Sequence, residues 1–254
     1  MKRIVAVALL VGAGLVTLLM TGLPKSDIVL TNARAVQVEG RPNMFMVTMT
    51  IQNDGGPVAL SSVSSPQAVS VSVMNPFGGG SPLIVPGSAT SEIAMDGAHV
   101  MLMIDGQGFS EGSLLPMTVT FADYGDVSTK VLNASADTMV MDHGPANGVL
   151  VSDTPTIAIS APEGITADGG ELLIETENFV FRKAEDTVPH IDNEGHAHVY
   201  LNGLKLGRLY GSTTQIGSLQ PGKYTVRISL HTNDHRPYLN DDGPAAAALS
   251  FEIP

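Results

Sequence analysis

Val69-Ser-Val-Ser-Val73 is the stretch that sets the fold class, because it alternates apolar and polar residues with a period of two. Such alternation is typical of a β-strand with one face on a core, so the valines are expected to point inward. The run Phe45-Met-Val-Thr-Met-Thr-Ile51 predicts another strand, and the turn-forming cluster Gln52-Asn-Asp-Gly-Gly-Pro57 ends it. No stretch shows a sustained helical period, so the sequence predicts a fold built from sheets.

Short runs of the same kind recur along the chain and divide it into two modules. We expect the first in residues 25–133 and the second in residues 156–254, with Asn202-Gly203 as a type I′ hairpin turn in the second. Residues 134–155 are rich in Ala, Ser, Asp, Gly and Pro, and they predict a linker. The expected class is all-β, with two antiparallel β-sandwich domains of Greek-key or cupredoxin-like type.

The composition excludes several functions. Thirteen Lys and Arg against 25 Asp and Glu give a net charge of −12, which argues against binding nucleic acid or an anionic membrane surface. The sequence has no cysteine, so it offers neither a disulfide framework nor a site for lipoprotein acylation. The 27 glycines and 16 prolines favour many short strands over helices.

The N-terminal segment, residues 1–24, predicts export. Lys2 and Arg3 give a basic start, and Ile4 to Leu23 is almost wholly apolar. This pattern is typical of a secretory signal peptide, although its length also fits an uncleaved membrane anchor. Either way, we expect the remainder to be periplasmic or extracytoplasmic.

The run Ala98-His-Val-Met-Leu-Met103 is the strongest functional signal in the first module. On a regular strand, His99, Met101 and Met103 point to the same face. Thioether and imidazole ligands side by side suit a soft ion, above all Cu(I). The alternative is ordinary packing, because methionine is also a common core filler.

The first module, from about residue 28 to residue 131, resembles the PCuAC family of periplasmic copper chaperones. The stretches that carry the resemblance are Asn32-Ala-Arg-Ala35, Gln52-Asn53, Ser62-Val-Ser-Ser-Pro66, Leu83-Ile-Val-Pro-Gly87, Asp96-Gly-Ala-His-Val-Met-Leu-Met103 and Gly112-Ser-Leu-Leu-Pro-Met-Thr-Val-Thr-Phe121.

This resemblance implies a particular Cu(I) site. The family binds Cu(I) with a His, a Met and a His-x-Met pair, and His99 and Met101 match that pair. Met74 occupies the position of the first His, and the middle Met has no counterpart in this chain. The resemblance also implies delivery of copper to a copper enzyme, such as the CuA subunit of a cytochrome oxidase.

A second ligand set lies in the second module, which contains five of the seven histidines of the chain: His190, His196, His198, His231 and His235. His196 and His198 are two residues apart on a predicted strand, so their imidazoles should share a side. If the strand before His231 pairs with it, the imidazoles could converge into a Cu(II) or Zn(II) site. The alternative is a set of polar loop and edge residues.

We found no catalytic motif, and we expect the protein not to be an enzyme. There is no Gly-x-Ser-x-Gly elbow, no His-Glu-x-x-His pair and no cysteine nucleophile. The sequence therefore predicts an exported copper chaperone, with Cu(I) in the first module and Cu(II) or Zn(II) in the second. The alternative is a non-catalytic binding or structural module with a degenerate copper site.

Overall fold

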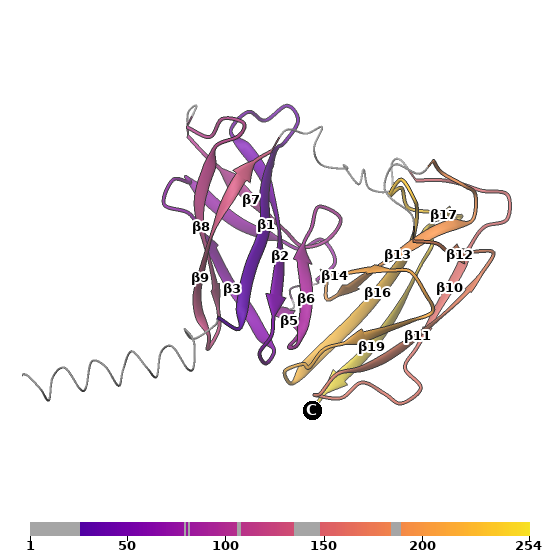
Figure 1. Cartoon of the computed structure of the whole chain (residues 1–254). Coiled ribbons are helices and arrows are strands. Elements are labelled where there is room, and N and C mark those ends of the chain that lie inside the picture. The colour runs from indigo at the N-terminus through magenta and orange to yellow at the C-terminus, as the bar shows by residue number, and fades with distance from the viewer. Residues whose placement is uncertain (1–25, 79, 81, 106–107, 135–147, 184–188) are drawn as a thin grey trace, which may run out of the picture.

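The computed structural model describes residues 26–78, 80, 82–105, 108–134, 148–183 and 189–254. In these ranges the named elements are all β-strands (Figure 1), which confirms the predicted all-β class. No helix among the described residues is long and apolar enough to cross a bilayer. The predicted signal or anchor segment, residues 1–24, lies outside these ranges, as does most of the predicted linker.

The strands of the first module run in chain order from the N-terminal side. They are β1 (Ile28–Gln37), β2 (Met44–Asn53), β3 (Val58–Ser64), β4 (Ser70–Met74), β5 (Leu83–Val85), β6 (Ala89–Ile93), β7 (His99–Met103), β8 (Leu114–Phe121) and β9 (Gly125–Asn133).

The second module is likewise built from strands. They are β10 (Thr156–Ser160), β11 (Gly170–Glu177), β12 (Val180–Phe181), β13 (Glu194–Leu201), β14 (Leu204–Leu209), β15 (Thr213–Ile216), β16 (Gly222–Thr232), β17 (Leu239–Asn240), β18 (Gly243–Pro244) and β19 (Ala246–Ile253).

The period-two patterns place the core as expected. In β2, Phe45 and Val47 are buried, while the residues between them are half-buried on the opposite face. In β4, Val71 and Val73 pack against the core of the first module. Val69 is 62% exposed, because the strand begins one residue later, at Ser70. Each module has a hydrophobic core built largely from such inward residues.

The two modules share a sheet. A 14-stranded sheet contains the order β19-β16-β13-β14-β6-β2-β1-β9-β8-β3-β5, so β14 of the second module lies beside β6 of the first (Figure 1). At this junction Lys205 lies opposite Glu92. A separate three-stranded sheet, β10-β11-β15, belongs to the second module. The strand pairs are antiparallel except β1 with β9 and β12 with β13, which are parallel.

The predicted hairpin at Asn202-Gly203 is confirmed, and it lies at the junction. Leu201 pairs with Leu204 across the turn. Both turn residues have positive φ, 47° and 87°, as a type I′ turn requires. The Gly203 carbonyl accepts a hydrogen bond from Ala98 N at 2.8 Å, so the turn contacts the segment just before β7.

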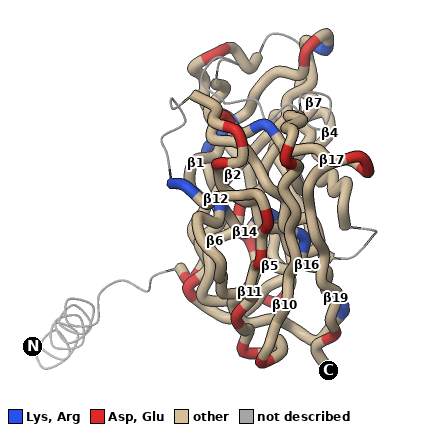
Figure 2. The backbone as a smooth tube through the Cα atoms, turned by 90° about the vertical axis from the view of Figure 1, so that its right-hand side faces the viewer, with Lys and Arg blue, Asp and Glu red and all other residues tan. Residues whose placement is uncertain are grey.

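Acidic residues outnumber basic ones over the chain as a whole. Figure 2 shows acidic positions in loops at both ends of the molecule. This distribution agrees with the net charge of −12.

Candidate metal centres

The first candidate site is the outer face of β2, β7 and β4, which we call the outer methionine face. It comprises Met44 and Met46 on β2, His99, Met101 and Met103 on β7, and Met74 on β4. Across the strands, Met74 pairs with His99, Met101 with Met46, and Met103 with Met44. Directly opposed side chains in a sheet lie about 5 Å apart at Cβ, so these pairs are neighbours.

The opposite face of the same three strands is the core of the module. Val100 and Leu102 alternate with the candidate ligands on β7, and both are completely buried. On the outer face Met74 is 49% exposed and Met103 is 38% exposed. His99 and Met101 are half-buried. The methionines of this face therefore lie at the surface, where core packing does not account for them.

His99 is oriented by a backbone group. Its Nδ1 lies 3.0 Å from the carbonyl oxygen of Gly97, which accepts the Nδ1–H. The lone pair of Nε2 is then available for a ligand bond, the arrangement common among metal-bound histidines. An imidazole with thioethers around it is a donor set for Cu(I).

Sequence reasoning placed Met74, His99, Met101 and Met103 but could not place Met44 or Met46. Period-two alternation with Phe45 and Val47 did indicate that these methionines face outward. The order of strands, which sets β2 beside β7, could not be read from the sequence. The Arg41 guanidinium lies 3.5 Å from the Met44 sulfur, so Met46 is the less engaged of the two.

The second candidate site is a buried cluster of histidines, and it forms because β13 pairs with β16. His196 lies directly opposite His231 in that pairing. The Nε2 atoms of His196 and His198 are 3.0 Å apart, on the same side of β13 as predicted. His196, His198 and His235 bring one nitrogen each to within 4.8 Å of the others, and all three are buried.

Asp96 of the first module completes the surroundings of this cluster. Its Oδ2 lies 2.7 Å from Nδ1 of His198 and 2.7 Å from Nζ of Lys205. The Tyr200 hydroxyl donates to the same oxygen at 2.6 Å. Burial acts to raise the pKa of Asp96, but the hydrogen bond from His198 and the charge of Lys205 hold that pKa well below its usual range. No pattern in the sequence connects Asp96 with these residues.

Burial keeps the histidines of the cluster neutral. Desolvation lowers the pKa of His196 to about 2 and that of His231 to about 3, with neighbouring histidines adding to the effect. The pKa of His198 is also lowered well below its ordinary value by desolvation. Neutral imidazole is the form that binds metal ions.

Two of the predicted ligands lie outside the close group. His231 stacks on His198 with ring centroids 3.9 Å apart. Its Nε2 lies 3.0 Å from Ser229 Oγ and its Nδ1 lies 3.3 Å from the His235 carbonyl. His190 lies in the loop before β13, where its Nε2 is 2.8 Å from Asp192 Oδ1. The predicted five-histidine site is therefore reduced to three close ligands.

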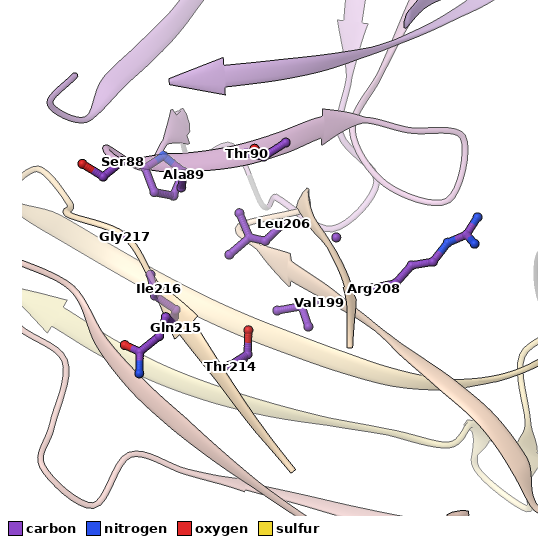
Figure 3. A pocket seen from close by; sticks show the side chains of 12 residues that line it. Ser88, Ala89, Thr90, Val199, Leu206, Arg208, Thr214, Gln215, Ile216 and Gly217 are labelled. Atoms are coloured by element: carbon purple, nitrogen blue, oxygen red, sulfur yellow. The ribbon is translucent and has the colours of Figure 1, made fainter. Parts of the chain in front are cut away.

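The junction between the modules also forms a cavity of about 290 Å³ (Figure 3). Its lining combines Ala89 and Thr90 of the first module with Val199, Leu206, Thr214 and Gln215 of the second. This mixture of small apolar and neutral polar groups offers no metal-ligand set.

Similarity to known proteins is found chiefly in the first module. Residues 28–133 match the family model of the LpqE-like lipoproteins. A copper-bound PCuAC domain from PmoF2 is 20% identical; the alignment covers 44% of this chain and 97% of that one, with a TM-score of 0.38. Cu(I)-bound DR1885 from Deinococcus radiodurans is 22% identical, with 44% and 79% covered and a TM-score of 0.35. No curated protein matches the chain. The family match confirms the predicted PCuAC-type first module.

Proposed function

We propose that this chain, whose residues 28–133 form a PCuAC-type module, is an exported copper-binding protein that holds Cu(I) on its outer methionine face. The observation that carries the proposal is the register of β4, β7 and β2, which aligns Met74 with His99 and Met46 with Met101. The Cu(I) ligands would be His99 Nε2 and the sulfurs of Met74 and Met101, with Met46 beside them.

The donor set fits Cu(I) in both number and chemistry. Cu(I) prefers soft ligands, and thioethers with one imidazole satisfy it without thiolate. In the PCuAC family that the first module resembles, one ligand is a Met with no counterpart in this chain. Met46 is the substitute that the strand pairing supports, because it lies directly opposite Met101.

Exposure argues against simple packing. Met49, also on β2, is 3% exposed and belongs to the core, as a space-filling methionine should. Met74 at 49% exposed has no such role. A flexible apolar side chain left in water gains nothing from burial, so a ligand role supplies the missing reason for its position.

Surface placement also suits transfer rather than turnover. An ion held at the face of a sheet can be reached by a partner's ligands, and exchange between the two ligand sets requires no opening of the core. The proposed recipient is a copper enzyme such as the CuA subunit of a cytochrome oxidase. This recipient rests on the resemblance of the first module to the PCuAC family, which the family match over residues 28–133 supports.

The test is a competition titration with a Cu(I) chelator under reducing conditions. The purified protein should bind one equivalent of Cu(I), and the double variant His99→Ala/Met101→Leu should lose that binding while keeping its melting temperature within a few degrees. Met49→Leu is the matched control, because it removes a thioether from the core alone. Equal Cu(I) affinity in the double variant and the parent would refute the proposal.

A further inference from the structure

We propose that His196, His198 and His235 form a binding site for a divalent transition-metal ion, Zn(II) or Cu(II), at the junction of the modules, with Asp96 as its positioning carboxylate. This site is independent of the Cu(I) site on the outer methionine face. The two sites are built from different residues and take different ions.

The spacing of the nitrogens is that of a metal site. Two imidazole nitrogens bound to one tetrahedral Zn(II) lie about 3.3 Å apart, since each Zn–N bond is about 2.0–2.1 Å. The Nε2 atoms of His196 and His198 are 3.0 Å apart, and the His235 nitrogen lies within 4.8 Å of both. Three protein nitrogens leave a fourth position for water or another donor.

Asp96 fixes the ring that needs fixing. Because Asp96 Oδ2 accepts the Nδ1–H of His198 at 2.7 Å, the Nε2 lone pair of His198 faces His196. Metal-bound histidines are commonly held in this way by a carboxylate, which sets the tautomer and makes the nitrogen a better ligand.

The backbone near His235 is shaped to bring its ring into the cluster. His235 has a φ of 67°, the left-handed region, in a turn where the Thr232 carbonyl accepts a hydrogen bond from its N–H. Asn233 in the same turn is 3% exposed, and both polar atoms of its amide are without a hydrogen-bond partner among the described residues. Such a buried, unsatisfied amide is unusual in a folded protein. A bound ion with its water would supply the missing partner.

The position of Asp96 has a consequence for the whole molecule. The three ligands belong to the second module, while the carboxylate that positions His198 belongs to the first, between β6 and β7. An ion at this site therefore favours the docked arrangement of the modules, because separation would remove the partner of His198.

The experiment titrates the purified protein with Zn(II), without reductant, by calorimetry at neutral pH. The parent should bind one Zn(II) and melt at a higher temperature with the metal than without it. His235→Ala should weaken Zn(II) binding at least tenfold and remove the thermal shift. Asp96→Asn should weaken binding roughly 10- to 100-fold, the usual loss when a positioning partner of a metal ligand is removed.

Two control variants show whether Zn(II) binds at these three histidines. His190→Ala removes a histidine outside the close group and should leave Zn(II) affinity unchanged. The variant His99→Ala/Met101→Leu should also bind Zn(II) normally, so failure of the Cu(I) proposal would not be mistaken for failure of this one. Absence of both Zn(II) and Cu(II) binding in the parent, or parental affinity in His235→Ala, would overturn the assignment.

Discussion

The Oδ2 atom of Asp96 lies 2.7 Å from Nδ1 of His198, although 102 positions separate the two residues in the chain. The same oxygen accepts hydrogen bonds from Lys205 and Tyr200. One carboxylate of the first module thus satisfies three donors of the second. The junction of the modules depends on this contact, because it compensates a buried cation.

Asp96→Asn should destabilise the metal-free protein by about 3–5 kcal/mol, since it leaves the ammonium of Lys205 buried without its counter-ion. The Lys205 side chain is only 8% exposed and lies 2.7 Å from Asp96. The measurement is urea unfolding at neutral pH. The double variant Asp96→Asn/Lys205→Met should recover part of the loss, because it removes the orphaned charge.

Asp126→Asn is the matched control, an exposed carboxylate whose removal should change stability by less than about 0.5 kcal/mol. If Asp96→Asn were equally silent, the buried pair would not stabilise the junction.

Met46→Leu should weaken Cu(I) binding about tenfold, because leucine keeps the volume but removes the sulfur next to Met101. The check is the same chelator competition used for the parent. Met49→Leu, on the same strand but facing the core, should leave the Cu(I) affinity unchanged. An identical small effect of both substitutions would indicate that Met46 is not a ligand.

Much of this arrangement followed from the sequence, because it depends on local patterns. The period of two in β4 and β7 was enough to put His99, Met101 and Met103 on one face. The Asn202-Gly203 turn was readable because few residue pairs tolerate two positive φ angles.

The remainder depends on which strands become neighbours, and no local pattern encodes that. Met46 joined the candidate site only because β2 lies beside β7. Asp96 joined the histidine cluster only because β14 lies beside β6, which brings Lys205 and His198 against the first module. His231 was predicted as a ligand, yet Ser229 and the His235 carbonyl occupy its nitrogens.

Gly203→Ala should cost clearly more stability than Gly40→Ala, although both glycines have similar positive φ, 87° and 72°. The backbone penalty of about 1–2 kcal/mol is common to both. A Cβ at Gly203 would also collide with the Asn75 side chain, whereas a Cβ at Gly40 would meet nothing within 4 Å. Thermal unfolding of the two variants checks this, and equal losses would show that the hairpin does not dock tightly on the first module.

Stability should fall at alkaline pH through Tyr238, which is fully buried. Burial raises its pKa to about 12, while the phenol of the unfolded chain titrates near 10. Between these values the unfolded state releases its proton first, so stability decreases as pH rises, by about 2.7 kcal/mol in total. Tyr238→Phe should lose this part of the pH dependence. An unchanged slope in urea unfolding between pH 9 and 12 would contradict the assignment.

The central claim, that Cu(I) is held by sulfur and nitrogen on the outer methionine face, is tested most directly by X-ray absorption at the copper edge of the Cu(I)-loaded protein. The account predicts a mixed first shell with more sulfur than nitrogen, and loss of the nitrogen contribution in His99→Ala. A shell of nitrogen alone would contradict the claim, because it would place Cu(I) among His196, His198 and His235 instead.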